Sequence, residues 1–298
     1  MRRCAPARPT ARIGAAARLS GVLILAALAA CARTPPATSA ASGYRAPSDT
    51  QVPDFAKKPY EPISRAAVVA IALREWRLFD RPVDDDPPDT RPQPPPDQMP
   101  ERQEGYWQRV GEYWWLALDP SDKEAAWTGK HDEFGLVFPA SEDGRYAWSA
   151  AFVSYVMRIA GAGPHFPYSM NHATYINIAK QMADGQTSGW IVTAERPENY
   201  APQPGDLICT GRGRSARLRY DDLPTASSFP AHCDIVVSRQ PNQISVIGGN
   251  VDDAVTMKHV PVTGDGRLAT PDGTVLDTRY PWMVVLKVLY PDAPPPVS

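Results

Sequence analysis

The fold is organised around residues 146–157, which read YAWSAAFVSYVM. Large apolar side chains recur there at the four- and five-residue intervals of a helix with one buried face: Trp148, Phe152, Val153, Val156 and Met157. Gly161 and Pro164 follow and mark the end of the helix. The stretch therefore predicts a buried helix that begins near Ser149.

Ser149 lies in the opening turn of this helix. The free backbone N–H groups and the positive end of the helix dipole favour developing negative charge there. A serine at this place serves either as an N-cap or as a nucleophile. Two later stretches, 231–237 (AHCDIVV) and 246–250 (VIGGN), put His232 and Asn250 on predicted strands and favour the nucleophile.

The composition is that of a folded domain with long connecting segments. Of the 298 residues, 43% are hydrophobic, which is enough for a sizeable core in one or two domains. The 33 prolines indicate much loop or tether. Five arginines lie in the first thirty residues, and without them 26 basic side chains face 33 acidic ones. Since Lys and Arg form no cluster, we expect no nucleic acid as a partner.

The N-terminus has the pattern of an export signal. Arginines precede an apolar run, 19–30, which is too short to cross a bilayer. The run ends in Leu28-Ala29-Ala30-Cys31, which resembles a bacterial lipobox and implies removal of residues 1–30 and lipidation of Cys31. The alternative is an ordinary signal peptide with an incidental cysteine. Ala32 stands where an aspartate would resemble an inner-membrane retention signal, so we expect a membrane anchor in the outer membrane, facing the periplasm.

Beyond Cys31, the chain divides by composition. Residues 31–60 are rich in Ala, Ser, Thr and Pro and predict a flexible tether. Residues 61–292 form a single predicted domain, and 293–298 are a tail. Within the domain, the Pro- and Asp-rich insertion 81–100 cannot continue a helix, and we expect an exposed loop. We expect the protein to be a monomer.

Helical patterns fill the first half of the domain, at 64–79, 104–118, 149–160 and 169–182. Strand patterns fill the second half, at 207–209, 232–238, 244–247, 255–262 and 283–290. Helices first and antiparallel strands second predict the α+β class, with N-terminal helices packed on a small antiparallel sheet.

Cys209 and Cys233 lie on two predicted strands that can be neighbours. In a compartment that permits disulfides they are either bridged or free. Two cysteines without a matching pair of histidines do not indicate zinc, and we expect neither a metal nor a cofactor. Because adjacent strand residues face opposite ways, Cys233 is badly placed to act with His232.

Four segments carry a resemblance to known cell-wall hydrolases. Residues 148–154 (WSAAFVS) resemble the Trp-Cys-Ala-x-Phe-Val-Ser signature of CHAP and NlpC/P60 enzymes, and 204–208 (PGDLI) are similar to their Pro-Gly-Asp-Leu strand. Residues 232–237 (HCDIVV) resemble their His-Val-Gly-Ile-Val strand, and 248–250 (GGN) fall where CHAP proteins carry Glu-x-Asn. The whole pattern, roughly 63–291, most closely resembles the bacterial DUF2272 group within that papain-like superfamily, which implies a papain-like, NlpC/P60-type fold.

The resemblance also implies an active site. The family's catalytic cysteine falls on Ser149, its histidine on His232 and its orienting residue on Asn250. His232 would take the proton from Ser149, and Asn250 would hold the imidazole. The implied reaction is hydrolysis of amide bonds in peptidoglycan peptides, with peptidoglycan or its fragments as the partner.

The chain departs from the family pattern at two positions. Ser149 replaces a cysteine, and a serine hydroxyl needs a general base because it is far less acidic than a thiol. Gly248 replaces the carboxylate of the CHAP pattern. The alternatives are therefore a serine hydrolase, an inactive papain-like lipoprotein that binds wall fragments or a protein, and other chemistry such as acyl transfer. A groove plugged by Trp148, Tyr146 or the loop 211–230 would favour the binding protein.

Four further residues are candidates for substrate binding. Trp148 precedes the nucleophile, and His172 lies on a predicted helix near Tyr175. Asp234 shares a strand face with His232. Arg212 follows the Cys209 strand and can receive a substrate carboxylate or can be part of a solvated loop.

Overall fold

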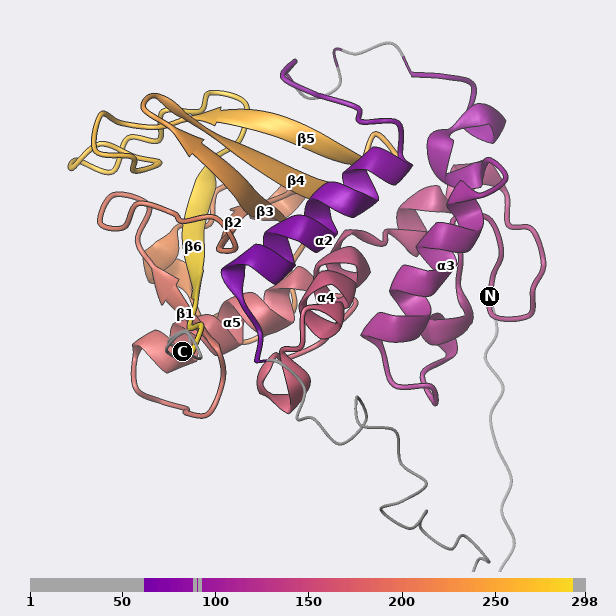
Figure 1. Ribbon diagram of the computed structural model, residues 1–298, viewed down its shortest axis with the longest axis horizontal. Coiled ribbons are helices and arrows are strands. Elements are labelled where there is room, and N and C mark those ends of the chain that lie inside the picture. Colours follow the sequence, from indigo (N-terminus) through magenta and orange to yellow (C-terminus); the bar gives the residue numbers. More distant parts are fainter. Residues whose placement is uncertain (1–61, 88–89, 91–92, 292–298) are drawn as a thin grey trace, which may run out of the picture. The chain divides into compact units, whose positions relative to one another are not determined.

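The structure is a computed structural model that describes residues 62–87, 90 and 93–291 (Figure 1). The predictions about the signal peptide 1–30, the lipidation of Cys31, the tether and the tail 293–298 fall outside the described residues. Within the described part, no helix is both long enough and apolar enough to cross a membrane.

One antiparallel sheet carries the second half of the chain. Its strands follow the order β1–β6–β2–β3–β4–β5. Their bounds are β1 Val192–Glu195, β2 Leu207–Gly211, β3 Ala231–Gln240, β4 Gln243–Val251, β5 Ala254–Pro261 and β6 Trp282–Val288. Long β3, β4 and β5 follow one another as neighbours, whereas β6 returns to lie between β1 and β2.

Helices precede most of the sheet in the sequence and pack against it (Figure 1). Their bounds are α2 Arg65–Leu78, α3 Tyr106–Ala117, α4 Ser149–Ile159 and α5 His172–Ala183. The central helix, α4, contacts β3 and β4, while α3 lies on α4 and α5 lies along β1. The chain is thus a mixture of α and β structure, as the order of the sequence patterns predicts.

Both faces of the sheet are covered, which explains the near-continuous apolar strands. On one face, Leu207, Ile235 and Ile247 join the helices in the main core. On the other face, a smaller core holds Ile208, Val236, Ile244, Val246, Val260, Val262, Leu268, Trp282 and Val285. From Ser149 to Met157 every residue of α4 is buried, so about the first two and a half turns of this helix are fixed in the core, and its last residue, Ile159, is exposed.

The helix signals in the sequence correspond to real caps. Ser64 accepts a hydrogen bond from the Ala67 N–H at 3.1 Å and starts α2. The helix predicted at 169–182 begins later, because Asn171 accepts from the Ala173 N–H and fixes the start of α5 at His172. The cap therefore decides the register of His172 on α5.

Two segments differ from the expectations. The short strand β1 was not expected; its four residues lie at the edge of the sheet and pair only with β6. The start of the Pro-rich insertion is also not a free loop. The Asp84 N–H donates to Met257 O at 2.8 Å and the Met257 N–H donates to Pro82 O at 3.0 Å, so this segment covers the outer edge of β5.

Candidate active site

Ser149 is the first residue of α4, and its hydroxyl does not cap the helix. Its Oγ lies 2.7 Å from Nε2 of His172. The side chain borders a cavity, although only 8% of the residue is exposed. Free N–H groups at a helix start lie next to this hydroxyl. The serine therefore has the position and the hydrogen-bond partner of a nucleophile.

His172 begins α5 and faces α4. Its second ring nitrogen, Nδ1, is hydrogen-bonded to the hydroxyl of Tyr175, one helical turn further on. Ser149, His172 and Tyr175 thus form a continuous chain of hydrogen bonds. For His172 to accept the serine proton at Nε2, its Nδ1 must carry the hydrogen and donate it to the tyrosine oxygen.

The surroundings of His172 keep its ring neutral. Burial lowers the pKa of His172 well below its usual range, and the nearby His232 and Arg212 lower it further, against the opposing effect of Asp234. A neutral imidazole can accept a proton at neutral pH, which a general base requires.

His232 is held by charged groups on the sheet. Its Nε2 lies 2.9 Å from Oδ1 of Asp234, whose Oδ2 lies 2.7 Å from Nζ of Lys258. Burial tends to raise the pKa of Asp234, but Lys258 and His232 outweigh it and hold that pKa far below its usual value. Burial lowers the pKa of His232. The ring therefore donates Nε2–H to a carboxylate, and Nδ1 has no hydrogen-bond partner among the described residues.

The structure brings Ser149 and both histidines together, but in a different arrangement from the one that the resemblance implies. The ring centroids of His172 and His232 are 5.5 Å apart. The hydrogen bond of Ser149 goes to His172, and the partner of His232 is Asp234. Asp234 is fully buried, so it positions His232 and does not meet a ligand directly.

Asn250 is the last residue but one of β4 and lies in the left-handed region, with a φ of 56°. With its amide oriented to satisfy both neighbours, it accepts from the Trp148 N–H at 3.2 Å and donates to Oδ1 of Asp253 at 2.9 Å. The residue expected to orient His232 therefore ties the end of β4 to the start of α4. Asn250 and His232 still border the same cavity.

Gly248 explains how Asp234 reaches His232. A Cβ at position 248 would lie 2.0 Å from Oδ1 of Asp234 and 2.8 Å from Nε2 of His232. No side chain fits there, because the aspartate occupies the space. The carboxylate of the CHAP pattern is thus absent from β4. Instead, β3 supplies the carboxylate of Asp234, two residues after His232.

Two cavities border these residues. One, of about 490 Å³, is lined by Ser149, His172, Arg212, Arg214 and part of the loop that ends at Pro230. The other, of about 330 Å³, lies by His232 and Asn250. Arg212 borders both cavities. Trp148 borders neither: it is fully buried, and its indole N–H donates to Glu101, so it supports the site from the core.

The comparisons with known proteins concern the part of the chain that holds this site. Residues 101–288, more than half of the chain, match the bacterial family described as "Uncharacterized protein conserved in bacteria (DUF2272)". The chain belongs to the DUF2272 family. The DUF2272 match contains Ser149, both histidines and the whole sheet, and it leaves out α2. No curated protein and no solved structure matches the chain.

A disulfide joins Cys209 and Cys233 within the DUF2272 region. The two residues face each other on β2 and β3 and belong to the main core. Because Cys233 is bridged and faces the helices, the thiol chemistry of the papain-like enzymes is not available at this position. The bridge holds the strand directly beside His232.

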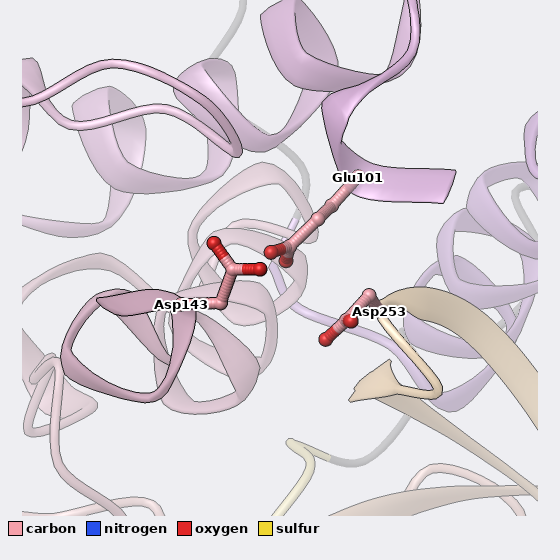
Figure 2. A group of neighbouring side chains, drawn as sticks. All are labelled: Glu101, Asp143 and Asp253. Atoms are coloured by element: carbon pink, nitrogen blue, oxygen red, sulfur yellow. The ribbon is translucent and has the colours of Figure 1, made fainter. Parts of the chain in front are cut away.

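A group of three carboxylates lies near the start of α4 (Figure 2). The side chains of Glu101, Asp143 and Asp253 point toward one another, with oxygen atoms within 4.8 Å. Arg102 pairs with Asp143 at 2.6 Å. Burial and the neighbouring acids raise the pKa of Glu101 to about 9 and that of Asp253 to about 6. These oxygens have the spacing to hold a cation, and the raised pKa values favour protonated carboxyl groups, which also lower the negative charge.

This carboxylate group was not expected from the sequence. Its members come from three separate segments of the DUF2272 region, and no spacing between them indicates a site. The group supports α4 through two contacts, since Glu101 accepts from the Trp148 indole and Asp253 accepts from Asn250.

Proposed function

We propose that this protein is a serine hydrolase that cleaves amide bonds in peptidoglycan peptides at the cell envelope, with Ser149 as the nucleophile. One observation carries the proposal: the hydroxyl at the start of α4 lies 2.7 Å from an imidazole nitrogen and borders a cavity. A papain-like fold is part of the proposal. It is supported by α4 packing on β3 and β4, with His232 on β3.

The geometry favours His172 as the base. As Ser149 Oγ attacks the carbonyl carbon, its proton passes to His172 Nε2, and the Nδ1–H bond to Tyr175 keeps the ring in place. His172 then gives this proton to the leaving amine, and water repeats the sequence on the acyl-enzyme. The N–H groups at the start of α4 are the candidate oxyanion donors, and each such donor is worth about 10²–10³ in rate.

His232 is the base that the family resemblance implies. Its Nε2–H is engaged with Asp234, so Nδ1 presents a lone pair in the same region. In this protein Asp234 takes the orienting role that the resemblance gives to Asn250. Variants of the two histidines distinguish these assignments, because the base removes the serine proton and the other histidine does not.

The proposed location in the cell rests mainly on the sequence. The run of small residues before Cys31 supports a lipid anchor in the outer membrane. A disulfide between Cys209 and Cys233 is consistent with an oxidising compartment such as the periplasm. Peptidoglycan lies in that compartment, which makes its peptides the substrate of choice for the first test.

The test compares the full chain in detergent with its Ser149→Ala variant on purified peptidoglycan, with released products read by mass spectrometry. We expect fragments from the parent and none from the variant, and the fragment masses identify the scissile bond. Absence of fragments, with the polymer still bound, would contradict hydrolysis and support the inactive binding lipoprotein. Equal release by both proteins would exclude Ser149 as the nucleophile.

A further inference from the structure

Arg212 is an exposed charged residue that borders the proposed site and has no role in the chemistry described above. It borders the Ser149 cavity and the His232 cavity. Its guanidinium is near enough to both imidazoles to lower the pKa of each, after the larger effect of burial. Its side chain is exposed, and among the described residues no carboxylate pairs with it.

The backbone of Arg212 is fixed although its side chain is free. Its N–H donates to Pro230 O at 2.9 Å, and its carbonyl accepts from the Ser215 N–H at 2.9 Å. The preceding Gly211 leaves no room for a side chain, because a Cβ there would lie 1.9 Å from Ser215 O. These contacts hold the Arg212 backbone beside the cavity, and its exposed guanidinium is available to a ligand there.

The charge of the Ser149 cavity has one sign. Its lining includes Arg212 and Arg214 and contains no aspartate or glutamate. Asn171 and Ser228 also border it, and their side chains are hydrogen-bonded to each other. A cavity with two cations and no anion favours a ligand with a negative charge.

The fork of an arginine matches a carboxylate with two parallel hydrogen bonds. We propose that the substrate carries a free carboxylate beside the scissile amide, and that Arg212 binds this carboxylate while Ser149 attacks the carbonyl carbon. This inference rests on the proposed hydrolase function and names its substrate class. It makes Arg212 a specificity-determining residue.

Binding of such a carboxylate would also act on the base. The positive charge of Arg212 disfavours the protonated form of His172, and a bound anion offsets that charge. The substrate would then assist its own cleavage, because His172 accepts the serine proton more readily when the carboxylate is in place.

The test uses two synthetic peptidoglycan stem peptides that differ in one group, a free carboxylate or a carboxamide beside the same amide bond. A charge-assisted pair corresponds to a factor of about 10–150. We expect the parent to prefer the carboxylate peptide by about that factor in kcat/KM. Arg212→Ala should abolish the preference, and Arg212→Lys should keep part of it. Arg217→Ala is the matched control, an exposed arginine of the same loop that borders neither cavity.

Each outcome decides the inference. Equal kcat/KM for both peptides overturns it and leaves the hydrolase intact. If neither peptide is cleaved, the hydrolase fails, and binding of the same two peptides to the parent is measured by calorimetry. If the parent binds the carboxylate peptide more tightly and Arg212→Ala loses this preference, the result still supports an anion site at Arg212. Equal affinity of the parent for the two peptides, or no binding, overturns the anion site. Unchanged thermal unfolding of the variant shows that the fold is kept.

Discussion

The two histidines of the site have adjacent rings, yet the helical side and the sheet side of the molecule hold them by different chemistry. On the helical side, His172 lies between two hydroxyl groups, those of Ser149 and Tyr175. On the sheet side, His232 is bonded to a carboxylate that is itself paired with Lys258. The hydroxyl partners hold the His172 ring by neutral hydrogen bonds, whereas the Asp234 carboxylate also favours the protonated form of His232 by its charge.

The largest expected effect tests which side supplies the base. His172→Gln should lower the rate of fragment release from peptidoglycan by about 10²–10⁴, because Ser149 loses its hydrogen-bonded base. Initial rates from mass spectrometry measure the loss. His232→Gln is the parallel variant, and we expect a smaller loss from it. A greater loss with His232→Gln would reverse the comparison and assign the base to the sheet side.

The next effect tests the ion pair on the sheet side. Asp234→Asn leaves the ammonium of Lys258 buried without its partner, so the free energy of unfolding should fall by about 3–5 kcal/mol. Urea unfolding measures this change. Adding Lys258→Met to the same chain should recover most of the loss, since the unpaired charge is then gone. No loss in the single variant would show that the pair does not hold this region.

A smaller effect is expected on the helical side. Tyr175→Phe removes the partner of a buried ring nitrogen in His172, and the free energy of unfolding should fall by about 1–3 kcal/mol. Tyr168→Phe is the control, because its hydroxyl has no hydrogen-bond partner among the described residues. Equal losses in the two variants would mean that the Tyr175 hydroxyl contributes nothing specific.

The last comparison separates the histidines from the carboxylate group by pH. The pKa of Glu101 is raised to about 9, so its stabilisation is full below its unfolded pKa of 4.5 and is lost as pH rises toward 9. The histidines have lowered pKa values, so their stabilisation is present above about 6.5 and is lost as pH falls. Glu101→Gln should therefore flatten the alkaline decline, by about 1 kcal/mol per pH unit at most.

Urea midpoints for the parent and Glu101→Gln between pH 5 and 9 measure that difference. The glutamine still offers an oxygen to the Trp148 indole, so the contact at the start of α4 is kept. Parallel curves for the two proteins would show that Glu101 does not titrate in this range.

The helices and the long strands could be predicted because their signals are local. The four- and five-residue spacing fixes α4, and Ser64 fixes the start of α2. The strand β1 could not be predicted, because a segment of four residues is too short to show the alternation of apolar and polar side chains. The start of α5 depended on whether Asn171 or an earlier residue caps it.

The site was predictable to the extent that it follows strand alternation. Asp234 shares the face of His232 because the two are separated by one residue, and the structure joins them. The bond between Ser149 and His172 depends instead on how α4 and α5 pack, and no sequence spacing specifies that. The role of Gly248 could not be predicted from the sequence either. It depends on Asp234, whose carboxylate occupies the position that a side chain at residue 248 would take.

The disulfide has a consequence for how the site is completed. Cys209 and Cys233 are separated by 24 positions, and their bond closes the intervening chain into a covalent ring. Arg212 and His232 are both members of this ring. As the reduced chain leaves the ribosome, the ring is open, and its closure removes many of the conformations available to the arginine-bearing segment. The cavity wall is therefore most strongly constrained where disulfides persist, outside the reducing cytosol.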